Sequence, residues 1–256
     1  MMLLMPKKKE NVHYFKRLSL TIFSLTFLLN TNVLGFGNKT HYAITKSAFV
    51  TTKMFSKFDS LDERLRLKEV LVNACNLPDE EESSWFFKWH FYNPMPTKTN
   101  KIEDLLTTDD NALKRTLLHY NKAVECFNTD KAKSIKELGA SLHYIQDCCC
   151  PVHLLGWSSW EHNKPVNFFE RKHGEYERKM DEQSSGFEYD LFYEEKKFNF
   201  KNVFELQGVL NAYPLATWID YNERKQIEPT YKVFKNAHEA SCELIYLFFK
   251  EVGIEL

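Results

Sequence analysis

The sequence lacks an excess of charge of either sign. Its 34 Lys and Arg nearly balance 35 Asp and Glu, so the formal net charge is −1 over 256 residues. A protein that binds a nucleic-acid backbone through counterion release needs a broad positive field, and this composition does not supply one. We therefore expect no stable nucleic-acid partner, while a small nucleic-acid substrate held by metal ions stays open.

Repeats, low-complexity tracts and alternating strand-like runs are also scarce. Their scarcity argues against repeat architectures and against a sheet. Apolar residues with helical spacing dominate after Gly35, and 43% of the residues are hydrophobic, which suits one globular domain. We expect a monomeric, all-α, single multi-helix domain. Its predicted helices cover residues 40–55, 61–75, 109–127, 131–149, 166–183, 202–221 and 230–252.

The apolar run Leu18–Leu29 is too short to cross a bilayer comfortably. It follows a basic stretch and precedes polar residues up to Gly35, with small or short residues at the third and first positions before Phe36. This pattern is typical of an export signal. We predict a signal peptide over residues 1–35, cleavage near Gly35 and Phe36, and a secreted mature domain over residues 36–256. An uncleaved membrane anchor is the alternative.

The sequence has six cysteines, and their number does not fix a pairing. Consecutive cysteines rarely bridge each other, because the geometry is strained. Any disulfide from Cys148, Cys149 or Cys150 would therefore use one of the three remaining cysteines. The alternative is a set of small buried residues with no disulfide.

The segment "HYIQDCCCPVH" carries the strongest chemical signal. His143 and Asp147 lie one helical turn apart and share a helix face, and His153 follows where Pro151 ends the helix. Imidazole and carboxylate groups at these offsets bring three metal-competent side chains toward one volume.

Other candidates are weak when each is taken alone. His173 and Glu177 repeat the one-turn spacing, which most often marks an exposed helix pair. His90 could be an ordinary partly buried ring, Asp79 a turn cap and His41 a solvated residue near a helix start. Because all five occur in one ordered set with the central motif, each is a stronger candidate for a metal ligand than it would be alone.

This ordered set resembles the zinc-dependent phospholipase C family. The family includes bacterial phosphatidylcholine-preferring enzymes and the catalytic domain of clostridial-type alpha-toxin, and it shares its fold with single-strand-specific zinc nucleases. The resemblance extends over essentially the whole mature chain. It implies an all-α catalytic domain over residues 36–256.

The resemblance also implies three zinc ions per chain. One zinc would be held by Asp79, His90, His143 and Asp147, and a second by His153, His173 and Glu177. The third would take His41, Asp147 as a bridging ligand, and the free amine and carbonyl of the mature first residue, Phe36. Members of the family usually begin with Trp, but main-chain atoms bind the metal, so Phe should serve.

The implied function is a phospholipase C that hydrolyses glycerophospholipids to diacylglycerol and a phosphorylated head group. The zinc ions would bind the phosphate and convert a water to hydroxide, and Asp79 would orient or deprotonate that water. Transient contact with a membrane surface would follow from the substrate. Aromatic rings near the ligands, including Phe91 and Tyr144, would either line a substrate pocket or pack in the core.

Two alternatives remain: a zinc nuclease or nucleotidase on the same fold, and a non-catalytic binding module stabilised by metal. Glu177 favours the phospholipases, because the nucleases typically carry Asp there. "CCCPVH" favours them too, because it lacks the His-Gln that commonly precedes Pro in the nucleases. The short spacing from Phe36 to His41 points toward the nucleases.

Overall fold

The computed structural model describes residues 37–58, 60–81, 87–92, 111–154, 166–190 and 231–254. The chain divides into two compact units, residues 1–32 and 33–256, and all of the described residues belong to the second unit. The predicted signal peptide, Phe36 and the predicted helix over residues 202–221 lie outside the described residues.

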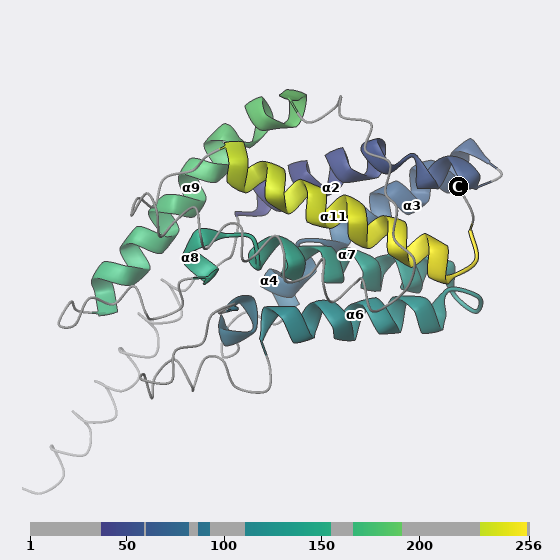
Figure 1. Ribbon diagram of the computed structural model, residues 1–256, viewed down its shortest axis with the longest axis horizontal. Helices are drawn as coiled ribbons and strands as arrows, with labels where there is room; N and C mark the ends of the chain where they lie inside the picture. Colours follow the sequence, from purple (N-terminus) through teal and green to yellow (C-terminus); the bar gives the residue numbers. More distant parts are fainter. Residues whose placement is uncertain are drawn as a thin grey trace, which may run out of the picture. The chain divides into compact units, whose positions relative to one another are not determined.

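The described residues form helices and no strand, as the sequence predicts (Figure 1). The longer helices are α2 (Asn38–Thr52), α3 (Leu61–Ala74), α6 (Ala112–Cys126), α7 (Lys131–Asp147), α9 (Val166–Asp190) and α11 (Tyr231–Glu251). The short ones are η1 (Met54–Lys57), α4 (Leu77–Glu81), η2 (Phe87–His90) and α8 (Pro151–Leu154).

Side-chain caps set the starts of three of these helices. The side chains of Ser60, Asn111 and Asp130 accept hydrogen bonds from backbone amides in the first turns of α3, α6 and α7. Each bond satisfies an amide that has no partner within the helix. Asp130 Oδ1, for example, accepts from the Lys133 amide at 2.9 Å.

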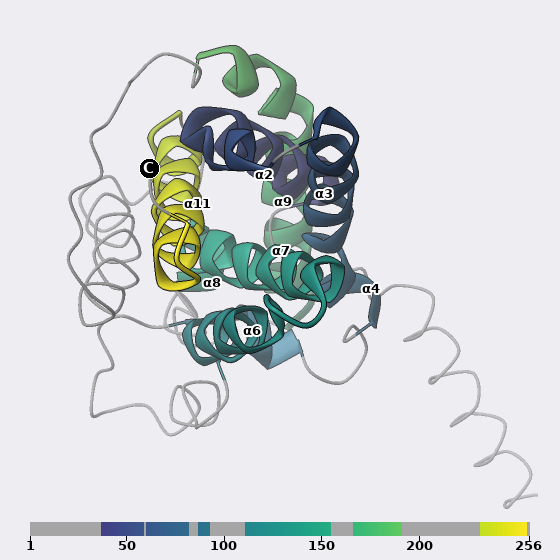
Figure 2. The ribbon, with the colours of Figure 1, turned by 90° about the vertical axis from the view of Figure 1, so that its right-hand side faces the viewer.

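Helix α7 is the centre of the domain. Every residue from Leu138 to His153 is buried, so the second half of α7 and the turn after it have no solvent-facing side. Figure 2 shows α2, α3, α7 and α11 around a common centre, with α6 on the far side of α7 from α2. Groups at the end of α7 are therefore enclosed by protein.

The close approach of α3 and α7 depends on a glycine. A Cβ added to Gly139 would lie 2.6 Å from the Leu71 carbonyl oxygen and 2.6 Å from Ala74 Cβ. Both neighbours belong to α3, and one of them is backbone, so the gap cannot open by a side-chain rotation. Gly139 thus allows α3 to pack directly against the middle of α7.

The predicted helix bounds are mostly confirmed to within a few residues. The helix predicted to reach residue 149 ends at Asp147, and Pro151 begins the separate short helix α8, a position where its missing amide costs nothing. Helix α9 runs to Asp190, beyond the predicted end at residue 183. Helix α4 was not predicted, because it is too short to show a periodic pattern.

All six cysteines are free thiols. Five of them are buried, including the three consecutive ones that follow α7. Burial raises the pKa of Cys75 to about 12, and burial also raises the pKa values of Cys148 and Cys150. The structure therefore agrees with the second sequence interpretation, in which the cysteines are small core residues.

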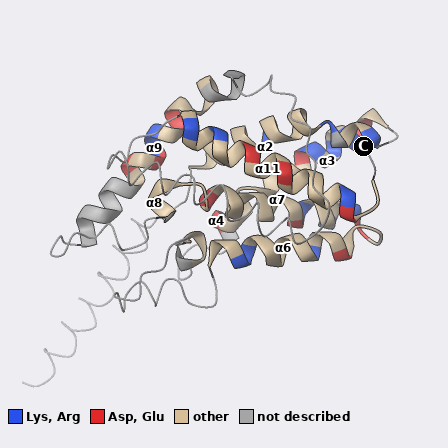
Figure 3. Ribbon diagram, in the orientation of Figure 1, with Lys and Arg blue, Asp and Glu red and all other residues tan. Residues whose placement is uncertain are grey.

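Charges of both signs are interspersed over the described helices (Figure 3). Ion pairs within one helix turn, such as Lys179 with Glu175 and Arg178 with Glu182, lie on the outer surface of α9. Among the described residues, no helix is long and apolar enough to cross a membrane.

The Gly139→Ala substitution should lower the free energy of unfolding by about 1–3 kcal/mol, because the added methyl group forces α3 and α7 apart. Gly186→Ala is the matched control, since a Cβ there meets nothing within 4 Å and alanine favours helix by up to about 1 kcal/mol. Urea unfolding followed by circular dichroism measures both. Equal effects of the two substitutions would contradict the packing role of Gly139.

Candidate metal centre

The C-terminal end of α7 carries two of the predicted ligands. His143 and Asp147 are fully buried, and His143 Nε2 lies 3.1 Å from Asp147 Oδ2. The predicted one-turn juxtaposition on a shared face is therefore present. The turn after α7 then brings His153, on α8, to within 3.7 Å of Asp147 Oδ1 through its Nδ1.

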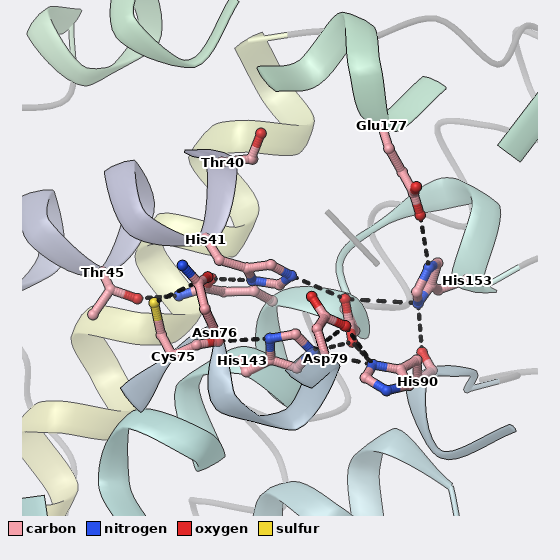
Figure 4. A network of polar contacts seen from close by, with 12 residues as sticks. Thr40, His41, Thr45, Cys75, Asn76, Asp79, His90, His143, His153 and Glu177 are labelled. Carbon is pink, nitrogen blue, oxygen red and sulfur yellow. Dashed lines mark hydrogen bonds and ion pairs between the residues drawn. The ribbon is translucent and has the colours of Figure 1, made fainter. Parts of the chain in front are cut away.

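Asp79 and His90 complete a four-residue group around the end of α7 (Figure 4). Asp79 lies on α4, and His90 ends η2. His90 Nδ1 lies 2.8 Å from Asp147 Oδ2, 3.1 Å from His143 Nε2 and 3.7 Å from Asp79 Oδ1. His143 Nε2 lies 3.5 Å from the same Asp79 oxygen. We call Asp79, His90, His143 and Asp147 the four-ligand cage.

The dimensions of the four-ligand cage suit a tetrahedral metal ion. Five of the six pairs among its donor atoms lie 2.8 to 3.7 Å apart. Ligand atoms at 2.0–2.1 Å from a tetrahedral zinc stand about 3.3 Å from one another. Within the described part of the chain, both Asp79 oxygens and Asp147 Oδ1 are buried without a hydrogen-bond partner. Buried polar atoms normally have partners, so these three oxygens point to a bound cation.

His41 approaches the cage from α2. Its ring stacks on the His143 ring, with centroids 4.0 Å apart, and its Nε2 lies 3.5 Å from Asp147 Oδ1. His41, Asp79 and His143 offer donor atoms that all lie within 4.8 Å of one another. The two oxygens of Asp147 thus face different histidines, an arrangement that a bridging ligand requires.

His153, which approaches Asp147 Oδ1, forms a further pair with Glu177. His153 Nε2 lies 3.9 Å from Glu177 Oε1, and both side chains are buried. Glu177 comes from α9 and reaches toward α8 (Figure 4). His173 lies on α9 one turn earlier, and its side chain lies outside the described residues.

Three of the histidines are held by an acceptor at Nδ1. The acceptors are the Gln146 side-chain oxygen for His41, the Cys75 carbonyl for His143 and the His90 carbonyl for His153, at 2.7, 2.7 and 2.6 Å. An oxygen of this kind can only accept, so each Nδ1 donates its proton. Each neutral ring then presents the Nε2 lone pair toward the carboxylates, as a metal ligand must.

The pKa values of the buried carboxyl groups of Asp147 and Glu177 are shifted in opposite directions. Burial alone would raise the pKa of Asp147, but when the neighbouring rings are protonated, the charges of His143 and His153 and the close approach of His143 and His41 hold it well below its usual range. For Glu177, burial first and then the nearby Asp79 and Asp147 raise the pKa well above its usual range. Burial lowers the pKa of His41, but its close contact with and attraction by the charged Asp147 raise it overall. The site thus concentrates negative charge that a cation would neutralise.

Aromatic rings pack behind the histidines. Phe91 is buried and stacks on His153, with centroids 4.8 Å apart, and fully buried Tyr144 lies 5.3 Å from both His90 and His143. These two rings, which the sequence left open as pocket or core, pack in the core and limit the motion of the ligand rings.

Two residues near the site were not singled out from the sequence. Gln146 lies inside the central motif, and Asp181 lies one turn after Glu177, which continues the His173 and Glu177 spacing. Asp181 Oδ1 accepts hydrogen bonds from the Thr40 amide and hydroxyl at 2.9 and 2.7 Å. It therefore ties the first turn of α2, which carries His41, to α9. The i, i+4 spacing was the available signal for Asp181.

The fold is similar to solved toxin structures. The alpha-toxin of Clostridium absonum matches with a TM-score of 0.64 and 17% identity, over 84% of this chain and 64% of the toxin chain. Alpha-toxin of Clostridium perfringens from avian strain SWCP matches with a TM-score of 0.59 and 15% identity, over 83% of this chain and 63% of the toxin chain. This chain thus spans less than two thirds of either toxin chain, and at these identities the likeness shows the fold alone.

No curated protein sequence matches the chain. The family described as zinc-dependent phospholipase C matches residues 40–225. This range covers more than half of the sequence and contains the whole four-ligand cage, His41, His153 and Glu177. The chain therefore belongs to the zinc-dependent phospholipase C family.

Proposed function

We propose that the protein is a secreted phospholipase C that hydrolyses glycerophospholipids to diacylglycerol and a phosphorylated head group. The four-ligand cage carries the proposal, because it gathers two imidazoles and two carboxylates at separations that suit zinc. Family membership supports zinc as the metal. The substrate would reach the site during transient contact of the monomer with a membrane surface.

The residues present fit a cluster of three zinc ions. The four-ligand cage would hold one ion, and His153 and Glu177 together with His173 would hold a second. His41 and Asp147 would hold the third, with the amine and carbonyl of Phe36 after cleavage. The fit is supported by the buried Asp79 and Asp147 oxygens described above and by the Nδ1 bonds that turn each Nε2 toward the cluster.

When bound, the zinc ions supply Lewis-acid stabilisation of the phosphate and activation of water. The chain's own residues supply the rest. Asp79 lies at the edge of the cage on the short helix α4, where its carboxylate can orient the attacking water and accept its proton. The buried rings of Phe91 and Tyr144 fix the histidines, so the donor set is preorganised before substrate arrives.

A zinc nuclease or nucleotidase is the second candidate. It is favoured by the short spacing between Phe36 and His41. Glu177 and the "CCCPVH" segment favour the phospholipase. A metal-stabilised module without activity is the third reading, and the buried donor set that the structure gathers argues against it.

Export would also complete the site. Phe36 directly precedes Gly37, and Gly37 lies against Asp181 at the start of α2, the helix that carries His41. Cleavage after Gly35 would create a free amine at this end of α2. Signal removal would then act as activation.

Zinc should raise the thermal midpoint of the zinc-free protein by several degrees, because it neutralises buried carboxylates. His143→Ala should lose at least about one zinc ion per chain and most of this gain. His238→Ala is the matched control, because His238 is a buried histidine on α11 whose ring contacts Thr51 and Cys242. Plasma mass spectrometry counts the zinc, and unchanged zinc content in His143→Ala would refute the cage.

The mature protein should release a phosphorylated head group from phospholipid vesicles and leave single-stranded DNA uncut. Asp79→Asn should reduce kcat about 100-fold or more, because it removes the proton acceptor and weakens one metal site. Asp62→Asn, an exposed acidic residue in the first turn of α3, is the control. Cleavage of DNA alone would establish the second candidate, and inactivity on both substrates with zinc loaded would leave the binding module.

A protein that retains Gly35 should bind about one zinc ion fewer than the protein that begins at Phe36, and it should have low activity. The reason is that the residue 36 nitrogen is then an amide and a poor metal ligand. Zinc counting and vesicle hydrolysis on the two purified forms measure this. Equal activity would show that the chain start takes no part in the site.

A further inference from the structure

Gln146 connects three helices at the back of the site. It precedes Asp147 on α7 and is fully buried. Its Oε1 lies 2.7 Å from His41 Nδ1, and its Nε2 lies 2.9 Å from Thr45 Oγ1 and 3.1 Å from Ser241 Oγ. His41 and Thr45 belong to α2, and Ser241 belongs to α11.

The hydroxyl partners fix the orientation of the Gln146 amide. Ser241 Oγ donates its only proton to the Ala237 carbonyl at 2.8 Å, so it can only accept from Gln146. The Thr45 hydroxyl bonds the Cys75 thiol, whose own proton points to the Val72 carbonyl, so Thr45 also accepts from Gln146. A flipped amide would face two oxygens with no proton to offer. The amide nitrogen therefore faces the hydroxyls, and Oε1 faces His41.

This orientation determines the tautomer of His41. Because Oε1 only accepts, His41 Nδ1 must carry a proton, and the neutral ring then has its lone pair on Nε2. Nε2 lies on the side of Asp147 Oδ1, 3.5 Å away. Hydrogen bonds that involve α11 and α2 thus determine which His41 nitrogen carries the proton. The other nitrogen, Nε2, keeps its lone pair and faces the cluster.

We propose that Gln146 is a positioning residue that holds His41 in the Nδ1–H tautomer and presents Nε2 to zinc. The zinc part of the inference rests on the proposed function, and the tautomer part does not. His143 and His153 obtain the same orientation from backbone carbonyls. For His41 the acceptor is a side chain, so its role can be removed by substitution.

The first test reads the tautomer directly. Long-range ¹H–¹⁵N NMR on the zinc-free protein, at a pH that keeps the His41 ring neutral, should show the proton on Nδ1. Gln146→Met, which keeps the side-chain volume and removes the acceptor, should shift the ring toward Nε2–H or a mixture. Gln146→Glu keeps an oxygen acceptor and should retain Nδ1–H. A proton on Nε2 in the natural protein, or an unchanged tautomer in Gln146→Met, would overturn the proposal.

The second test measures zinc affinity by chelator competition. Gln146→Met should weaken the zinc site that contains His41 about 10- to 100-fold. Ser141→Ala is the matched control, because Ser141 is also fully buried on α7 and donates to the Thr116 carbonyl without reaching a ligand. It should lose stability and keep zinc affinity.

The third measurement separates positioning from general structure. In a His41→Ala background, Gln146→Met should cause no additional loss of zinc affinity, because its target is gone. An equal loss in both backgrounds would show a structural role only and overturn the inference. If the natural protein binds no zinc, the proposed function fails, and the NMR result still decides whether Gln146 orients His41.

Discussion

The structure depends on a buried carboxylate in an unfavourable place. Asp147 is fully buried and is the last residue of α7, where the helix dipole is negative. A buried charge of this kind is tolerated only when it is paired with an opposite charge or coordinates a metal ion. His41, His90, His143 and His153 all approach its two oxygens, from separate elements. The packing of α2, η2 and α8 against α7 brings these rings into place. The contacts that build the fold therefore also compensate the buried charge of Asp147.

The features predicted from the sequence are local along the chain. His143, Asp147 and His153 lie within one helix and the turn that follows it, so their spacing already implies that they meet. The interruption at Pro151 is equally local. Asp79, His90 and His41 show no such spacing. They could be assigned only through the resemblance to a family, and the structure now brings them to the end of α7.

Other features could not be predicted, because they depend on contacts between distant segments. The bond from His41 to Gln146 joins residues 105 positions apart, and the bond from Thr40 to Asp181 joins residues 141 positions apart. Neither leaves a periodic pattern. The close approach at Gly139 could not be predicted either. From the sequence alone, a glycine within a helix only indicates lower helix stability, and its packing role becomes clear when the neighbouring helix is known. The short helices α4 and α8 have too few residues for periodicity, and tertiary contacts stabilise them.

The hydrogen bond that His153 Nδ1 donates to the His90 carbonyl has a consequence for how the metal cluster would fill. His90 contributes its ring to the four-ligand cage and its backbone oxygen to the orientation of His153, which faces Glu177. Ordering the first site therefore also orders part of the second. By thermodynamic reciprocity, each ion would improve the affinity for the other. Partly filled clusters would then be rare, and the protein would pass between empty and full states with positive cooperativity.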